Sequence, residues 1–198
     1  MIIKNEIRVV GFDDGPFVHA QKKRGRKAQV LVVGVILRAK EYLDGVLSTY
    51  VELDGLDATG KIIKLVNGSR HFDQLRVILF SGLAVAGFNL IDIHKVSRET
   101  GKAVIAVTSK KPDRARFIEA LKNLDRHEER RDIVGRAGEV KTIEVRRKKM
   151  YFQYAGATEN EARELLIKTS HRSATPEAIR IAHIIASGIV DGESRGRP

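Results

Sequence analysis

The sequence contains no cysteine among its 198 residues. It can therefore form no disulfide, no thiolate metal site and no cysteine nucleophile. It also lacks any apolar run near the roughly 20 residues that a membrane-spanning helix needs, and its N-terminus lacks the basic-then-apolar pattern of a secretion signal. No linker or internal repeat divides the chain, so we expect a single cytoplasmic domain over residues 1–198.

Positive charge is what the chain has in excess. Its 36 lysine and arginine residues against 25 acidic ones give a net charge of +11, which suits a polyanionic partner because neutralised phosphates release counterions. The alternative is the generally charged surface of a thermophile-like protein. The excess is grouped in a loop and in a predicted hairpin tip, and we predict that both groups bind nucleic acid: Lys22, Lys23, Arg24, Arg26 and Lys27, and Arg146, Arg147, Lys148 and Lys149. Aromatic residues beside the tip either stack on a base or pack in the core: Tyr151, Phe152 and Tyr154.

The order of predicted elements is typical of an RNase-H-like α/β fold. Apolar runs and alternation predict three strands in an antiparallel meander, with Asp44-Gly45 as the turn before the third. A helix follows, and then a strand, a helix and a strand whose crossover makes both strands parallel to the first. A further helix, a charged excursion, a hairpin and two helices complete the chain. We therefore expect a mixed sheet of three antiparallel strands followed by parallel strands, with helices on both faces. The predicted strands are residues 7–11, 28–37, 46–53, 75–80, 103–108, 140–145 and 150–154; the helices are 58–66, 90–99, 112–124, 158–168 and one from 175 onward; the excursion is 125–139.

Two adjacent carboxylates, Asp13 and Asp14, follow the first predicted strand. Open α/β sheets place their sites at the ends of central strands. Neighbouring side chains on a strand point to opposite faces, so only one of the two faces a given site, and Asp13 is the first choice. The alternative is a turn, for which Asp-Gly-Pro is well suited.

A Mg²⁺ site at Asp13 requires further hard oxygen ligands to converge on it. Asp57 begins a predicted helix, where it can cap the helix and still present an oxygen, although capping alone also explains it. His183 lies on the flank of the apolar stripe of the last helix, where a histidine is either functional or a hydrogen-bonded core residue. Asp44, Asp54, Asp73 and Asp92 are the other candidates. Asp44 and Asp54 each precede a glycine and are typical turn residues.

Several sequence blocks follow one another along nearly the whole chain: VVGFDDGPF, YLDGVLSTYVELDGLDAT, SRHFDQLRVIL, GLAVAGFNLIDI, SKKPD, IEALKNL, PEAIRIAHIIASGI and GESRGR. Together they resemble the endonuclease dU family, which is found mainly in archaea and is distantly similar to endonuclease V. The resemblance implies an RNase-H-like fold and a Mg²⁺- or Mn²⁺-dependent endonuclease of DNA repair that nicks DNA at deaminated bases, deoxyuridine in particular. It implies that the partner is a DNA duplex with a deaminated base. The sequence leaves a monomer and a homodimer equally open.

The resemblance also implies roles for single residues. Asp13, Asp57 and His183 match catalytic positions of endonuclease V, with Asp13 and Asp57 as metal ligands. Ser81 stands where endonuclease V has an aspartate, and a neutral hydroxyl is a poor substitute for a charged ligand. Either another carboxylate compensates as a metal ligand, Asp14 or else Asp92, or metal binding is weak.

Two other functions stay open. Ser81 favours a nucleic-acid-binding protein of the same fold with weak or no catalysis, and the similarity to endonuclease V allows an RNase on inosine-containing RNA. Selectivity for a deaminated base in DNA requires a pocket for the extruded base. The loop after Ser81 and the turn over residues 13–17 are its expected walls.

Overall fold

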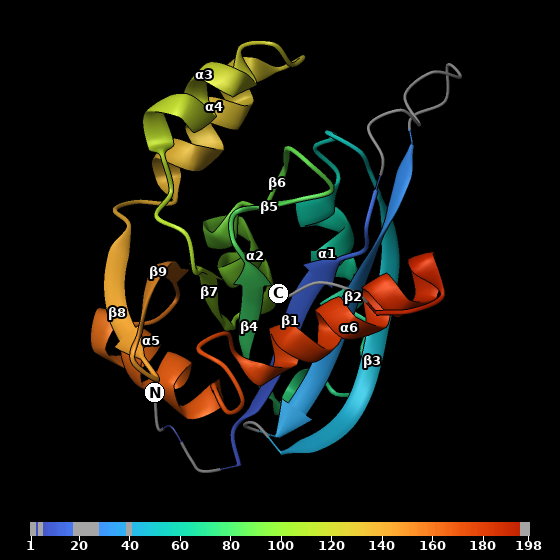
Figure 1. Cartoon of the computed structure of the whole chain (residues 1–198), viewed down its shortest axis with the longest axis vertical. Helices are drawn as coiled ribbons and strands as arrows, with labels where there is room; N and C mark the ends of the chain where they lie inside the picture. Colours follow the sequence, from blue (N-terminus) through green and yellow to red (C-terminus); the bar gives the residue numbers. More distant parts are fainter. Residues whose placement is uncertain (1–2, 4–5, 18–27, 39–40, 195–198) are drawn as a thin grey trace.

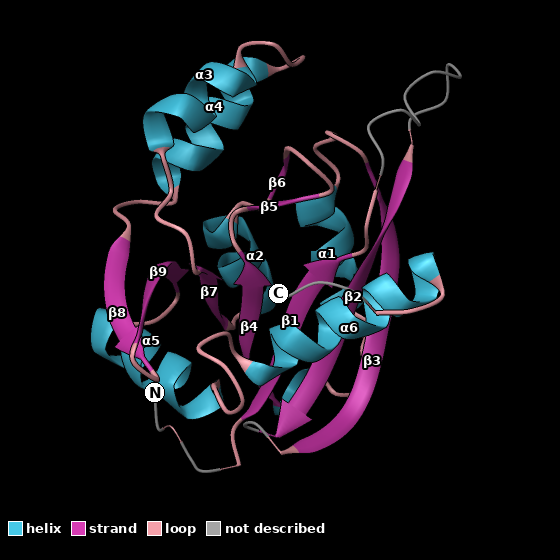
Figure 2. Ribbon diagram, viewed as in Figure 1, coloured by secondary structure: helices cyan, strands magenta, loops and turns pink. Residues whose placement is uncertain are grey.

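A seven-stranded mixed sheet forms the centre of the protein (Figures 1 and 2). The computed structural model describes residue 3 and residues 6–17, 28–38 and 41–194. The strand order is β3-β2-β1-β4-β7-β9-β8, in which β1, β2 and β3 form an antiparallel meander and β4 and β7 run parallel to β1. A hairpin of β8 and β9 extends the sheet beyond β7. The predicted sheet is confirmed. The strands are β1 (Arg8–Asp14), β2 (Gln29–Arg38), β3 (Tyr42–Glu52), β4 (Leu75–Ser81), β7 (Ala103–Thr108), β8 (Lys141–Val145) and β9 (Lys148–Ala155).

Helices cover both faces of the sheet, as predicted. The alternation of β1 assigns its side chains to two apolar cores, since Val9 packs in the core that includes residues of α5 and α6, while Val10 and Phe12 pack in the core that includes residues of α1 and α2. The helices on the two faces are α1 (Ala58–Asn67) and α2 (Ile93–Thr100), and α5 (Glu159–Thr169) and α6 (Glu177–Asp191). No helix in the described ranges has the length and apolarity of a membrane span.

The predicted turn at Asp44-Gly45 is wrong, because both residues lie inside β3. The carboxylate of Asp44 is 2.6 Å from the Arg8 side chain and 3.2 Å from the Arg38 side chain. The pairing of β2 with β3 shifts register beside it, between Ile36 and Leu37. Asp44 therefore forms ion pairs beside this register shift instead of making a turn. The strand β3 begins before it, at Tyr42.

The helix predicted over residues 90–99 begins later, at Ile93. Asp92 caps it by accepting a hydrogen bond from the backbone N–H of Lys95 at 2.9 Å. The residues before the cap instead form a small hairpin of β5 (Ala84–Val85) and β6 (Asn89–Leu90). A short 3₁₀ helix, η2 (Phe72–Gln74), precedes β4.

The charged excursion over residues 125–139 contains a helix that sequence reasoning missed, α4 (His127–Arg136), which lies beside α3 (Arg114–Leu121) beyond the edge of the sheet (Figure 1). Arg130 of α4 is only 1% exposed. Its guanidinium donates to the carbonyl oxygens of Asp54, Gly55 and Phe88 at 2.6, 3.0 and 2.7 Å. This one buried arginine ties α4 to the loop after β3 and to the β5–β6 hairpin.

Candidate active site

The packing of α6 against β1 brings together Asp13 and His183. Nδ1 of His183 lies 2.9 Å from Oδ2 of Asp13. The helix approaches the strand closely because Gly11 has no side chain, and a Cβ there would lie 2.5 Å from the backbone nitrogen of Ile179, one turn before His183. The site at the C-terminal end of β1 thus depends on a glycine two residues before the carboxylate.

Both groups of this pair are largely withdrawn from solvent. Burial, followed by the negative charge of Asp14, raises the pKa of Asp13 to about 6, although the contact with His183 acts in the opposite direction. Nε2 of His183 is buried and has no hydrogen-bond partner among the described residues. Buried polar atoms are nearly always paired in folded proteins. With the ring proton on Nδ1, Nε2 therefore offers a lone pair to a water or a ligand.

Asp14 has a different environment from Asp13. Its carboxylate accepts a hydrogen bond from the backbone N–H of Ala86 at 2.6 Å, which comes from the β5–β6 hairpin. Burial raises the pKa of Asp14 despite this bond. The two neighbouring carboxylates therefore contact different elements, as expected from the alternation of side chains along a strand.

The carboxylate of Asp57 forms hydrogen bonds and an ion pair with residues near the start of α1. Its carboxylate accepts from the Asn89 side chain at 2.6 Å and from the backbone N–H of Glu52 at 3.1 Å, and it lies 2.7 Å from Nζ of Lys61. It precedes α1 but makes no side-chain cap hydrogen bond. Burial alone would raise the pKa of Asp57, but the hydrogen bonds from Lys61 and Asn89 outweigh it and lower the pKa.

Ser81 lies beside Asp13 in the sheet. Phe12 of β1 pairs with Phe80 of β4 in parallel register, and their rings stack with centroids 5.5 Å apart. The next residue of each strand, Asp13 and Ser81, therefore turns toward the opposite face, the one covered by α6. The hydroxyl of Ser81 thus occupies the position from which a second carboxylate would meet Asp13.

The predicted set of three aspartate ligands does not form a cage. In the part of the chain that the structure describes, no group of three or more histidine, aspartate or glutamate side chains is arranged to hold a metal ion. The donors present fit the sparser mode in which Mg²⁺ is held by one or two carboxylates together with waters and substrate phosphates. Asp13, buried without a cationic lysine or arginine partner among the described residues, is the carboxylate that suits this mode.

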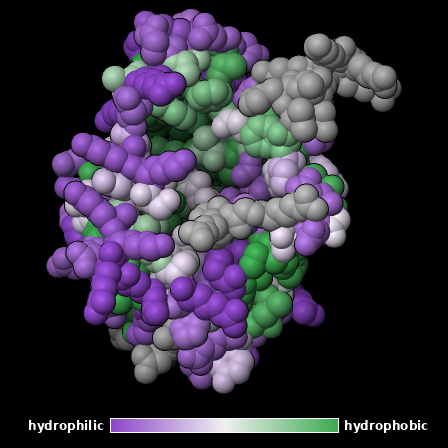
Figure 3. Space-filling model, in the orientation of Figure 1, coloured by the Kyte–Doolittle hydropathy of each residue, from purple (hydrophilic) through white to green (hydrophobic). Residues whose placement is uncertain are grey.

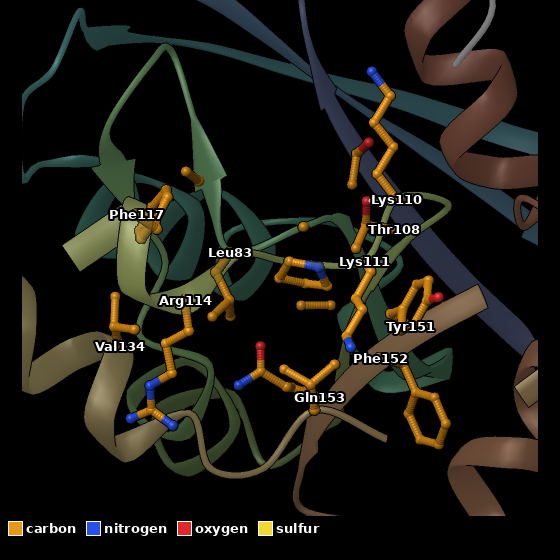
Figure 4. Close-up of a pocket in the computed structure, with 16 residues that line it drawn as sticks. Leu83, Thr108, Lys110, Lys111, Arg114, Phe117, Val134, Tyr151, Phe152 and Gln153 are labelled. Atoms are coloured by element: carbon orange, nitrogen blue, oxygen red, sulfur yellow. Dashed lines mark hydrogen bonds between the residues drawn. The ribbon is translucent and has the colours of Figure 1, made fainter. Parts of the chain in front are cut away.

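A cavity of about 300 Å³ opens at the C-terminal ends of β4 and β7. Figure 3 shows hydrophobic residues in a recess below the α3–α4 pair with hydrophilic residues around it, and Figure 4 shows side chains that line the cavity. The loop after Ser81 forms one wall of this cavity, whereas residues 13–17, the other wall expected of a base pocket, do not line it. The rest of the wall comes from β7 and the residues that follow it, and from residues of α3, α4 and β9, among them Gln153. No local signal in the sequence marks Gln153, because only the pairing of β9 with β7 brings it to this edge.

The predicted basic tip is a tight turn between β8 and β9. Arg146 and Arg147 both have positive φ, 51° and 62°. Because Tyr151 pairs with Thr108, the turn extends past the C-terminal end of β7, the edge at which Asp13 also lies. Tyr151 and Phe152 both contribute to the lining of the cavity, but Phe152 is 1% exposed and packs in the core, where its ring is not available to stack on a base. The other basic group, Lys22 to Lys27, lies outside the described residues.

Comparisons with known proteins agree with this geometry. The sequence profile described as Endonuclease dU matches residues 5–190. A UPF0215 protein of Methanopyrus kandleri is 48% identical over 97% of this chain and 95% of its own length. The crystal structure of a protein of unknown function from Archaeoglobus fulgidus matches with a TM-score of 0.81 and 38% identity, over 92% of this chain and 97% of that one.

Endonuclease V of Ciona intestinalis, solved in complex with DNA containing an inosine followed by a ribo-adenosine, has the same fold. It matches with a TM-score of 0.60 and 12% identity, over 93% of this chain and 86% of that one. At this identity the likeness concerns the fold alone. The RNase-H-like fold expected from the order of elements is thereby confirmed.

Proposed function

Because the chain belongs to the endonuclease dU family, we propose that it nicks DNA at deaminated bases, deoxyuridine in particular. The observation that carries the proposal is the contact of Asp13 with His183 at the C-terminal end of β1. A carboxylate that orients an imidazole is a common arrangement for moving protons in catalysis. The inosine-containing DNA in the complex of Ciona intestinalis endonuclease V supports nucleic acid as the ligand.

His183 would move the proton in this reaction. Asp13 holds Nδ1 at 2.9 Å and so fixes the orientation of the ring. Nε2 then takes a proton from the attacking water or, once protonated, gives one to the leaving oxygen. Asp13 would also hold a Mg²⁺ or Mn²⁺ ion, which when bound supplies electrostatic stabilisation of the phosphate. The carboxylate of Asp57 already contacts Lys61 and Asn89, so its role would be to keep the start of α1 in place.

The test is a nicking assay on duplexes that differ in one base. Purified protein is incubated with uracil-containing, hypoxanthine-containing and unmodified DNA duplexes and with inosine-containing RNA, with Mg²⁺, Mn²⁺ or a chelator. We expect a nick in the uracil-containing strand that the chelator abolishes. Cleavage of the RNA alone would assign the activity to RNA, and cleavage of every duplex at one rate would remove the deaminated base from the proposal.

A nucleic-acid-binding protein without catalysis is the second candidate, and the hydroxyl of Ser81 beside Asp13 favours it. Such a protein binds the duplexes of the same panel and leaves all of them intact. Binding that does not change in Asp13→Ala, together with the absence of nicking, would decide for this candidate.

Ser81→Asp is expected to strengthen metal binding, because it adds a second carboxylate beside Asp13 on the same face of the sheet. Affinity for divalent cations follows the number of charged ligands, so the Kd for Mn²⁺ should fall about tenfold or more. Calorimetric titration with Mn²⁺, without DNA, measures it. Ser48→Asp adds the same charge at an exposed position of β3 and is the matched control. Equal Mn²⁺ affinities in the two variants would contradict a cation site at Asp13.

Removing the two arginines of the hairpin turn is expected to weaken binding to all duplexes alike. Phosphate contacts carry affinity without sequence information, so in Arg146→Ala/Arg147→Ala the slope of log K against log salt should become shallower by about 2. Fluorescence anisotropy at several salt concentrations measures the slope. Lys64→Ala/Arg98→Ala removes the same charge from exposed positions of α1 and α2. An equal change in this control would show a general charge effect instead.

A further inference from the structure

The cavity at the ends of β4 and β7 combines an apolar lining with one buried amide. Its volume of about 300 Å³ is at the small end of the range for small-molecule sites. In Figure 4 the amide of Gln153 projects into the space between Leu83, Arg114 and Lys111. The apolar part of the lining suits the faces of a planar ring: Leu83, Phe117, Val134 and Tyr151.

The orientation of the Gln153 amide is fixed by a hydrogen bond. Its Nε2 donates to the carbonyl oxygen of Gly138 at 2.9 Å. A carbonyl oxygen only accepts, so the nitrogen end of the amide must face Gly138 and the oxygen end must face away. No described residue donates a hydrogen bond to Oε1, and Gln153 is only 9% exposed. The cavity therefore contains one fixed hydrogen-bond acceptor that a ligand can use.

Deamination changes the group that such an acceptor would meet. When cytosine becomes uracil, or adenine becomes hypoxanthine, the exocyclic amine becomes a carbonyl and the ring nitrogen on the pairing edge gains a hydrogen. A fixed acceptor gains a hydrogen bond from that N–H, whereas the unmodified base presents a lone pair to it and leaves both atoms unpaired. Thymine and guanine also carry a ring N–H, but in a duplex they are correctly paired, so their extrusion costs more than that of a mismatched base.

We propose that Gln153 determines specificity, with its Oε1 accepting a hydrogen bond from the ring N–H that deamination creates in a base held in this cavity. This inference rests on the proposed function, since it takes a base extruded from nucleic acid as the ligand. The cavity borders the candidate active site, because Ser81 of its wall lies beside Asp13 on the neighbouring strand, about 5 Å away in a sheet. Gln153 itself lies on β9, three strands from β1, so the base would be held beside the reacting groups and not among them. Lys111 and Arg114 line the cavity, are exposed and form no ion pair with a described residue. Their charged groups would contact the phosphates on either side of the extruded base.

The test measures binding and not cleavage, in the Asp13→Asn background. Each pair of DNA duplexes carries the same mismatched partner, so that the cost of extrusion is similar: uracil or cytosine opposite cytosine, and hypoxanthine or adenine opposite adenine. We expect the parent protein, Asp13→Asn, to bind the duplex with the deaminated base at least about tenfold more tightly than the duplex with the unmodified base. Gln153→Leu should bring the ratio to about 1. Gln74→Leu, the same substitution at an exposed position before β4, should leave it unchanged.

A second measurement needs no variant and is independent of folding. Uracil methylated at the ring nitrogen lacks the N–H, and the parent should bind it no more tightly than cytosine. A ratio preserved in a folded Gln153→Leu protein, or unimpaired binding of the methylated base, or no preference in the parent, overturns the inference. If Gln153 sets the binding ratio but wild-type protein nicks no duplex, the proposed function fails and the inference stands. If wild-type protein nicks uracil duplexes and Gln153→Leu nicks them with the same selectivity, the proposed function stands and the inference about Gln153 fails.

Discussion

Asp13→Asn is expected to reduce the nicking rate on a uracil-containing duplex by about 10²- to 10⁴-fold, the usual contribution of acid–base groups. The amide is nearly the same size as the carboxylate but has no negative charge with which to stabilise the imidazolium of His183 or a bound cation. His183→Gln should cause a similar loss, and the double variant should be little worse than either, because residues that act as a unit are not additive. Single-turnover gel assays measure the rates.

The fold should survive this substitution. Asp13 is 6% exposed, and an amide is less costly to desolvate than a carboxylate, so the melting temperature of Asp13→Asn should equal or exceed that of the wild type. Asp73→Asn is the matched control, since Asp73 is exposed in η2, before β4. DNA affinity should be retained in both variants. A fully active Asp13→Asn protein would contradict the assignment of the active site.

Gly11→Ala is expected to damage stability and activity together. The added Cβ would lie 2.5 Å from the nitrogen of Ile179 and 2.6 Å from the carbonyl carbon of Ala178, and both are backbone atoms that cannot rotate away. Overpacking of this kind typically costs about 1–3 kcal/mol. Relief requires α6 to move away from β1, which separates His183 from Asp13. Urea denaturation measures the stability, and the nicking assay measures the consequence for the site.

Gly135→Ala in α4 is the matched control, because nothing lies within 4 Å of the Cβ that it would add. Removing a helical glycine generally stabilises a protein by about 0.5–1 kcal/mol. The free energy of unfolding is therefore expected to fall in Gly11→Ala and to rise in Gly135→Ala. If Gly11→Ala is as stable as the wild type and fully active, the close approach of α6 to β1 is not what positions His183.

The sheet could be predicted from sequence because its strands differ strongly in composition from the connections. Apolar runs rich in valine and isoleucine mark β1, β2, β4 and β7, which contribute buried residues to both faces of the sheet. The failure at Asp44-Gly45 has a local cause, since the same dipeptide suits a turn or a bulge and only its partners Arg8 and Arg38 decide. Arg130 shows the same limit, because a charged segment gives no sign that one of its arginines is buried.

The candidate site could be predicted only in part. The position of Asp13 at a strand end and its separation from Asp14 follow from the geometry of strands. The pairing with His183 was suggested by resemblance, and the structure brings the two side chains together. The hydrogen bonds that engage Asp57 involve Asn89, 32 residues away, and the cavity around Gln153 is built from four separate segments. Such contacts depend on the whole fold and leave no pattern in the sequence.

Strand cleavage by the wild-type protein tests the proposed function most directly, on two duplexes that are identical except for a single uracil in place of cytosine, with Mg²⁺ or Mn²⁺ present. We expect one break, in the uracil-containing strand at or near that base, and none in the cytosine duplex. No break in either duplex, or equal breakage of both, would contradict it.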